Sequence, residues 1–217
     1  MKKFRNHTPK RRYTGIPKVF YEDYREQLAE DFEHRCAYTD CSDRWWLDGF
    51  HIDHFAPKEP RGITDPTKKA AFKRLENEYT NLVYVCPQVN RAKSDDWVTD
   101  DPTQATNGDN GYLDPCSDFN EYFERTDGGA IVPKNNHSHA TYMWRRLKLY
   151  LRLYELIWRL EQIAERRTML IAISKRDSLD TKFTHDILLA IRDLSDEYDK
   201  YWDYLGVNYQ AIIRGRT

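Results

Sequence analysis

HIDHFAPK, at residues 51–58, and NLVYVCPQVNRAKSD, at residues 81–95, are the two stretches that decide the fold of this 217-residue chain. The first belongs to an apolar, strand-like run (49–55), which Pro57 stops because proline cannot donate to a strand ladder. The second begins as a β-rich run and continues into a polar segment (90–96) that has the character of a helix start. Two neighbouring strands and a following helix are therefore predicted.

The polar side chains along these elements are able to hold one hard divalent cation beside a general base. Asp53 and Asn90 offer carboxylate and amide oxygens, which are the donors that Mg²⁺ and Mn²⁺ prefer. His54 has an imidazole with an ordinary pKa of about 6.5, so it can be neutral at cellular pH and accept a proton from water. His51 faces the same side of the strand as Asp53, where it either lines the site or has a core role.

The order Asp53-His54, then Asn81, then Asn90 with Lys93 three residues on, resembles the HNH endonucleases, whose ββα-metal motif binds one Mg²⁺ against a scissile phosphate. The nine-residue interval between Asn81 and Asn90 is that of the Asp-His-Asn versions of the motif. The resemblance implies hydrolysis of DNA to 5′-phosphate and 3′-hydroxyl ends, with His54 as general base and Asp53 and Asn90 as ligands of Mg²⁺ or Mn²⁺. It further implies that Asn81 ties the loop after the first strand and so aims the imidazole. Lys93, expected on the first turn of the helix, would hold a phosphate.

A second level of resemblance extends over most of the chain. Leu-Asp-Pro at 113–115, Glu-Tyr-Phe at 121–123 and Ile-Val-Pro at 131–133, followed by a Leu- and Arg-rich helix, are similar to the PtuB-type HNH proteins. Those proteins accompany an ATPase in Septu anti-phage systems and in some retrons. The resemblance therefore implies an effector nuclease of a defence system, with DNA as substrate and an ATPase as partner.

An α+β fold is expected, in which a small HNH core has a mainly helical N-terminal segment and a C-terminal helical extension. A chain of this length can form one ordinary domain or a small domain with an extension, and the composition of the C-terminal part favours the second. The expected parts are a basic arm (1–19), the nuclease core with a lead-in helix (20–97), a connecting loop with a short hairpin (98–140) and a helical region (141–217).

Positive charge is concentrated near the N-terminus, although the net charge of the chain is −1 and gives no general sign of a nucleic-acid binder. Residues 1–18 carry seven Lys and Arg side chains and no acidic residue. Such an arm either follows phosphates or forms a solvated, disordered tail.

The segment between the two motif stretches (59–78) is also basic and is predicted to be a loop followed by a helix from Thr67 to Glu76. Cations beside a nuclease site would hold the backbone on either side of the cut, whereas on another protein they would form a solvated face. Given the neighbouring motif, we expect phosphate contacts from Lys58 and Arg61.

Four cysteines in an intracellular chain indicate metal binding or simple burial before disulfides. Three of them stand near the positions of the structural zinc that many HNH proteins hold with two Cys-x-x-Cys pairs: Cys36, Cys41 and Cys86. The first pair is wider here, and Val89 stands where the fourth thiolate would be. A complete zinc site would have to recruit His34 or Cys116. The favoured alternative is that the three cysteines are buried small hydrophobic residues.

Residues 141–173 contain no Gly or Pro and are predicted to form one long helix that pairs with an antiparallel helix at 182–205. Arginines recur every seven residues along it, which gives a cationic stripe roughly 30 Å long. They are Arg145, Arg152, Arg159 and Arg166. The stripe would follow a nucleic-acid backbone or an acidic partner, or be a solvated face paired with glutamates, which is the more frequent cause. The aromatic residues of the second helix are expected in a core or a partner interface.

The longest apolar runs span about five residues, so a soluble, cytoplasmic protein without a membrane segment is expected. Two further hypotheses stay open. One is a non-catalytic module that binds nucleic acid or a partner on an HNH scaffold, although the intact Asp53, His54 and Asn90 argue against it. The other is an HNH nuclease that cuts RNA, because the motif contacts backbone phosphate and reads no bases.

Overall fold

The structure is a computed structural model that describes residues 1–46, 49–176 and 180–214. It divides into two compact units, Met1–Tyr150 and Leu151–Thr217. Helices and strands both occur, in agreement with the predicted α+β class. The second unit begins later than the expected boundary at 141, because one further helix belongs to the first unit.

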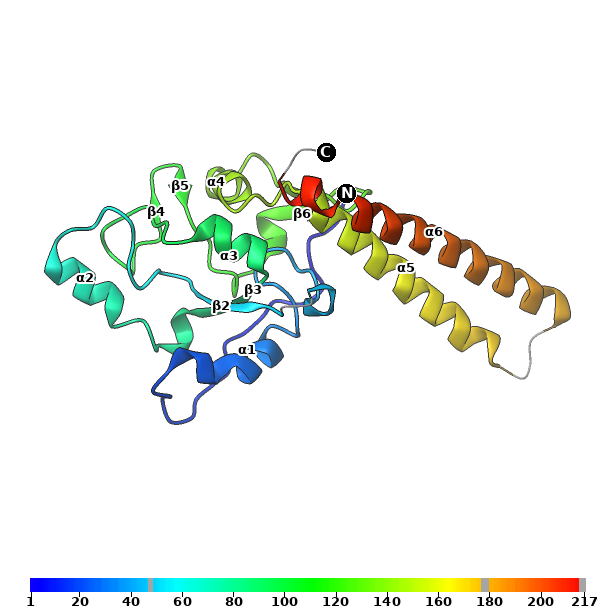
Figure 1. Cartoon of the computed structure of the whole chain (residues 1–217), viewed down its shortest axis with the longest axis horizontal. Helices are drawn as coiled ribbons and strands as arrows, with labels where there is room; N and C mark the ends of the chain where they lie inside the picture. Colours follow the sequence, from blue (N-terminus) through cyan, green and yellow to red (C-terminus); the bar gives the residue numbers. More distant parts are fainter. Residues whose placement is uncertain (47–48, 177–179, 215–217) are drawn as a thin grey trace. The chain divides into compact units, whose positions relative to one another are not determined.

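The centre of the first unit is a pair of antiparallel strands followed by a helix (Figure 1). In β2 (His51–His54) and β3 (Leu82–Val85), Asp53 lies opposite Val83 and His54 opposite Leu82. All four residues of β3 are buried. The helix α3 (Pro87–Lys93) begins earlier than predicted, because a proline at the first helical position has its φ angle preset for the helix.

The predicted lead-in helix is present as a 3₁₀ turn, η1 (Tyr21–Tyr24), continued by α1 (Arg25–Asp31). It buries Tyr24 and Leu28 and lies against β3. The helix ends where two consecutive residues after Phe32 have positive φ angles, which no α-helix accommodates.

Between the two strands, α2 (Pro66–Lys73) confirms the helix predicted for this segment. Asp65 caps it by accepting hydrogen bonds from the main-chain nitrogens of Thr67 and Lys68, and Pro66 occupies the first helical position. A short 3₁₀ turn, η3 (Tyr79–Asn81), then leads into β3. Another such turn, η2 (Asp43–Trp45), precedes β2.

A second sheet has the strand order β1 (Lys2–Lys3), β6 (Phe123–Arg125), β7 (Ile131–Pro133). The hairpin of β6 and β7 confirms the short hairpin predicted within residues 98–140. The short β1 pairs antiparallel with β6 and brings the N-terminus into the unit. The turn η4 (Phe119–Glu121) precedes β6.

The N-terminal segment is therefore not a free basic arm. Arg5 is only 3% exposed and donates to a main-chain oxygen. Arg11 donates to the first main-chain oxygen of β3 at 2.8 Å and to both carboxylate oxygens of Asp114 at 3.0 Å. Arg12 pairs with Asp31 at 3.0 Å. Because these three arginines hold the segment against the fold, the alternative of a disordered tail is wrong, and contact of this segment with phosphates stays a prediction.

The long connection after α3 contains a small hairpin that the sequence did not predict, β4 (Thr106–Asn107) with β5 (Asn110–Gly111). Gly108 lies in its turn with a φ of 58°, a conformation that glycine adopts without strain.

The prediction of one helix over 141–173 is wrong. The chain forms α4 (Ser138–Arg146) in the first unit and α5 (Arg152–Ser174) in the second. Between them Lys148 adopts a φ of 55°, and three alternate leucines of the connection are buried: Leu147, Leu149 and Leu151. The favourable free energy of burying these side chains outweighs the high helix propensity of the residues in this segment. The arginine stripe is broken at this point.

In the second unit, α5 and α6 (Thr181–Ile213) form the predicted antiparallel pair (Figure 1). Arg152 and Arg159 of the predicted stripe donate to the hydroxyls of Tyr204 and Tyr201 on α6, at 2.9 and 2.6 Å. No helix in the described ranges is both long enough and apolar enough to cross a bilayer.

Candidate active site

His54 ends β2 with one side of its imidazole held by the protein. Its Nε2 atom lies 2.8 Å from the main-chain oxygen of Glu76, and a carbonyl oxygen can only accept, so Nε2 carries the proton. The neutral ring then has its lone pair on Nδ1, which makes no hydrogen bond to any residue that the structure describes. The ring also contacts Tyr21 edge to face, with centroids 4.7 Å apart. These contacts fix the tautomer and leave the basic nitrogen for a ligand.

The charge state of His54 suits proton abstraction. Burial lowers its pKa below the ordinary 6.5, and the cations Lys58 and Lys93 act in the same direction, whereas the Glu76 carbonyl and Asp53 oppose them. The side chain is only 7% exposed, which is why the cost of desolvating the imidazolium is the largest of these effects. The imidazole is therefore neutral at pH 7.

Asp53 is buried next to it and has one carboxylate oxygen without a hydrogen-bond donor. Oδ1 accepts from the main-chain nitrogen of His54 at 2.8 Å. Oδ2 forms an ion pair with Lys93 Nζ at 3.1 Å, but the approach lacks hydrogen-bond geometry, and no described residue donates to Oδ2. A buried acceptor without a hydrogen-bond donor is unfavourable, so Oδ2 keeps acceptor capacity that a bound cation could use beside the Lys93 ammonium.

Lys93 is the last residue of α3 and is fully buried. Besides pairing with Asp53, its Nζ donates to the main-chain oxygen of His54 at 2.6 Å. The prediction that Lys93 clamps a phosphate from the first turn of the helix is therefore wrong, because a buried ammonium with two protein partners is not presented to a substrate. It holds the end of α3 against the Asp-His pair.

Asn90 and His51 join the middle of α3 to the start of β2. The Asn90 amide nitrogen lies 2.8 Å from His51 Nδ1 and donates to it. His51 and Asp53 are two residues apart in β2, so their side chains lie on the same face of the strand. The helix α3 covers that face. No described residue donates to the Asn90 amide oxygen. His51 therefore orients the amide, and the metal-ligand role of Asn90 stays a prediction.

Asn81 makes the loop-tying hydrogen bonds that were predicted. Its side chain accepts from the main-chain nitrogen of Ala56 at 2.8 Å and donates to the main-chain oxygen of the same residue at 2.9 Å. It also donates to the oxygen of Leu75 at 3.2 Å. Leu75 directly precedes Glu76, whose carbonyl holds the imidazole of His54. Asn81 thus fixes both the loop after β2 and the segment that orients the proposed base.

Glu76 and Tyr21 are parts of the site that sequence reasoning missed. Glu76 holds His54 with its main chain, and its carboxylate pairs with Lys58 at 2.9 Å and Lys73 at 2.8 Å. These hydrogen bonds lower the pKa of Glu76 to about 2. A main-chain acceptor leaves no residue signature, so no motif could have indicated it. Lys58 lies at the site and is paired with the Glu76 carboxylate, and its contact with a phosphate stays a prediction.

Arg61 pairs with Asp95 at 2.8 Å, and its side chain is still 69% exposed. An exposed pair of this kind is weak enough to exchange for a phosphate, and the contact stays a prediction. Further along the same surface, Lys68 forms an ion pair with Asp100.

The three candidate zinc cysteines are buried and close together. The main-chain nitrogen of Cys36 donates to the oxygen of Cys41 at 2.9 Å, and that of Cys86 donates to Cys36 Sγ at 3.4 Å. Burial raises the pKa of the Cys36 thiol, but hydrogen bonds, the strongest from Cys86, outweigh it and bring the pKa to about 7. Val89, in place of a fourth thiolate, is fully buried.

Both side chains that could complete a zinc site have other neighbours. His34 Nδ1 lies 2.9 Å from a carboxylate oxygen of Asp43. Burial, which outweighs the opposing charge of Arg11, raises the pKa of Cys116 to about 11, and the main-chain nitrogen of Cys116 donates to a carboxylate oxygen of Asp114 at 2.9 Å. Within residues 1–46, 49–176 and 180–214, no three or more His, Cys, Asp and Glu side chains form a group able to hold a metal.

The hard cation implied by the motif, Mg²⁺ or Mn²⁺, is bound by oxygen ligands instead of the thiolates of a zinc site. Asp53 Oδ2 and the Asn90 amide oxygen come from the two elements that pack together, and neither receives a hydrogen bond from a described residue. One carboxylate and one amide leave the other coordination positions of Mg²⁺ to water and phosphate oxygens, as that ion prefers. The residues present therefore fit the cation.

The chain matches no family model, no curated protein and no solved structure.

Proposed function

We propose that this protein is a metal-dependent endonuclease of the HNH type that hydrolyses phosphodiester bonds of DNA. The observation that carries the proposal is the contact of His54 Nε2 with the Glu76 carbonyl, because it leaves a neutral imidazole with its lone pair on Nδ1. A general base of this kind, beside a buried carboxylate oxygen without a donor, suits the activation of water against a phosphodiester.

In the proposed reaction, Nδ1 of His54 takes a proton from the attacking water, and the Glu76 carbonyl stabilises the imidazolium through Nε2. Asp53 and Asn90 would hold one Mg²⁺ or Mn²⁺. A cation held there would supply stabilisation of the negative charge that develops on the phosphate and on the leaving 3′ oxygen. Lys93 and Asn81 act as positioning residues, since both are bonded to the main chain around the Asp-His pair.

The proposal includes a role as the effector of an anti-phage system that works with an ATPase. The sequence resemblance in residues 113–133 supports this role. Exposed apolar side chains on the second unit would suit contact with such a partner, since five of them lie on α6. They are Phe183, Leu188, Leu189, Trp202 and Val207.

The test is cleavage of plasmid DNA, single-stranded DNA and RNA by the purified chain with Mg²⁺, Mn²⁺ or EDTA. His54→Ala should lower the cleavage rate by about 10²–10⁴-fold, the usual contribution of a general base. His185→Ala, an exposed histidine on α6, is the matched control and should cut normally. A His54→Ala protein as active as the wild type would refute the proposal.

The other outcomes separate the alternatives. Metal-dependent cutting of RNA alone would change the substrate and keep the enzyme. If nothing is cut, the assay is repeated with a candidate partner ATPase of the same defence class added. If cleavage then appears and requires His54, the protein is a nuclease that needs its partner for activity. If there is still no cleavage, a non-catalytic binding module is favoured.

A further inference from the structure

The hairpin of α5 and α6 carries two runs of five consecutive apolar residues, at 169–173 and at 187–191. Both runs lie toward the end of the hairpin where α5 finishes and α6 begins (Figure 1). Successive helical residues are turned by about 100°, so five apolar residues in a row surround a helix, whereas one neighbouring helix covers only one side of it. Of these ten residues, all within the described part of the chain, only Ile187 is buried. The hairpin therefore has apolar surface that its own two helices do not cover.

One face of α5 combines this apolar surface with positive charge. It consists of four residues at intervals of three and four, which share a face of a helix: Arg166, Met169, Ile173 and Arg176. Arg176 lies two residues beyond α5, but its main-chain nitrogen donates to the oxygen of Ile173 at 3.1 Å and continues the last turn. Neither arginine side chain forms a hydrogen bond or an ion pair with a residue that the structure describes. The segment 166–176 contains no acidic residue, so this face is basic.

One face of α6 combines apolar surface with negative charge. Its four exposed residues follow one another at the same intervals: Asp186, Leu189, Asp193 and Asp196. Asp193 has only a weak, exposed ion pair with its neighbour Arg192, at 3.0 Å. The side chains of Asp186 and Asp196 have no hydrogen bond or ion pair within the described ranges. The acids of this face are therefore available to cations of another molecule.

The two faces lie on the same side of the hairpin. The contact between the helices is marked by Arg167 and Tyr198, since the guanidinium lies 5.2 Å from the centre of the ring. At about 100° per residue, each face is turned from this contact by about 140–160°, in the same sense along the chain. Because α5 and α6 are antiparallel, equal rotations bring both faces to one side. A second molecule can therefore contact both at once.

The charges on the two faces have matching positions. Arg166 and Arg176 are ten residues apart, as are Asp186 and Asp196, and ten helical residues span about 15 Å. A two-fold axis along the hairpin places α5 of one copy antiparallel to α6 of the other. Arg166 then lies level with Asp196 of the second copy, and Arg176 with Asp186. The apolar residues between them meet in the middle of the contact.

The area of this side of the hairpin is sufficient for a stable dimer. With 23 residues, α5 is about 35 Å long at 1.5 Å per residue, and each helix is about 10 Å wide. Two helices side by side thus present about 700 Å², which is near the figure of about 800 Å² that each partner buries in an interface of standard size.

We propose that two copies of this chain associate through these faces into a four-helix bundle, with α5 of each copy against α6 of the other. Charge complementarity selects a second copy, because the chain itself carries both the basic face and the acidic face that fits it. Leu189 lies at the contact between the copies. Leu188 and Trp202 lie on another side of α6 by helical spacing, so they stay exposed for an ATPase partner.

The experiment measures the mass of the full-length chain by sedimentation velocity at micromolar concentrations. The wild type should have twice the 26.0 kDa of one chain. One variant carries Arg166→Glu with Arg176→Glu, and a second carries Asp186→Lys with Asp196→Lys. Each variant alone places like charges opposite each other, which should raise the dissociation constant at least about 100-fold and give a monomer.

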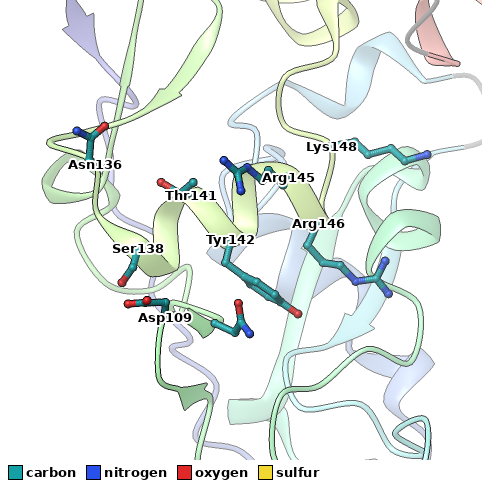
Figure 2. Close-up of a pocket in the computed structure, with 9 residues that line it drawn as sticks. Asp109, Asn136, Ser138, Thr141, Tyr142, Arg145, Arg146 and Lys148 are labelled. Carbon is teal, nitrogen blue, oxygen red and sulfur yellow. The ribbon is translucent and has the colours of Figure 1, made fainter.

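An equimolar mixture of the two variants should form a dimer again. In that mixture the introduced glutamates face the introduced lysines, and the remaining arginines face the remaining aspartates. Mixing cannot restore the dimer if either variant has failed to fold, so the mixture separates loss of the interface from loss of the fold. The matched control is Arg145→Glu with Lys148→Glu, two exposed cations of the first unit whose charged ends point to opposite sides beside a cavity of about 620 Å³ (Figure 2). This control should remain a dimer.

The remaining outcomes overturn the proposal. A wild type that is a monomer at every concentration leaves the two faces for a different protein. A dimer that persists in either variant alone is formed by another surface. A mixture that stays monomeric shows that α5 of one copy does not meet α6 of the other. The nuclease assay is independent of all of these results.

Discussion

The Nε2 atom of His54 and the main-chain oxygen of Glu76 are 2.8 Å apart, and this contact determines which ring nitrogen can act as a base. The carbonyl accepts the Nε2 proton in both charge states of the ring. Only Nδ1 therefore gains and loses a proton as the pH changes.

The pH dependence of cleavage follows from this contact and from the burial of His54. Burial lowers its pKa below 6.5, so the neutral base predominates from below that pH upward. We expect kcat/KM to rise with pH through a midpoint below 6.5 and then to stay level to pH 8. Initial rates at saturating Mg²⁺ between pH 5 and 8 measure the profile. A midpoint at 7 or above would show that another group limits the reaction.

Asn81 is expected to be important for stability as well as for cleavage. Asn81→Ala removes hydrogen bonds to Ala56 and Leu75 and leaves the buried main-chain nitrogen and oxygen of Ala56 without partners. With about 1–3 kcal/mol for each of these two unsatisfied groups, we expect a loss of about 2–6 kcal/mol in the free energy of unfolding, measured with urea. Asn77→Ala, on the same loop, is the control and should stay within about 0.5 kcal/mol. Equal effects of the two substitutions would contradict the role given to Asn81.

The elements that carry the site could be predicted from sequence because short-range signals specify them. The apolar run over 49–55 and the β-rich run before Pro87 predicted β2 and β3, and Asn81 was expected to tie the loop that it does tie. These features depend on residue type and spacing. The sequence therefore indicated part of the surroundings of His54, but not its contacts with Glu76 and Tyr21.

Tertiary contacts account for what was missed. The break between α4 and α5 has no Gly or Pro and arises from the burial of alternate leucines around Lys148. Lys93 looked like a surface lysine, yet it is buried because Asp53 and the His54 carbonyl are its partners. The role of Glu76 depends on a main-chain oxygen, for which side-chain identity carries no information.

The buried pair of Asp53 and Lys93 predicts a specific response to metal. Lys93→Met removes the cation and leaves the Asp53 carboxylate buried without its ion pair, so we expect the free energy of unfolding in EDTA to fall by about 3–5 kcal/mol. Mg²⁺ bound at Asp53 would restore part of this loss. The rise in Tm on adding Mg²⁺, measured by differential scanning fluorimetry, should therefore be larger in Lys93→Met than in the wild type.

The double variant Asp53→Asn with Lys93→Met is the control for this prediction. It removes both charges, so it should recover much of the stability in EDTA and lose the response to Mg²⁺. An equal response to Mg²⁺ in the double variant and in Lys93→Met would place the cation elsewhere.

Arg11 tests whether the N-terminal segment has a structural role or binds DNA. Its guanidinium donates to the main-chain oxygen of Leu82, opposite His54 in the sheet, and to Asp114. Arg11→Gln should lower the free energy of unfolding by about 2–3 kcal/mol, since hydrogen bonds to charged groups contribute about 1.5–3 kcal/mol. Lys10→Gln, which removes the same charge from an exposed neighbour, should leave stability unchanged. Because Arg11 is engaged within the fold, we expect both variants to bind a fluorescein-labelled 24-base-pair DNA duplex with the same salt dependence, measured by fluorescence anisotropy. A smaller slope for Arg11→Gln alone would show that Arg11 leaves these partners to contact phosphate.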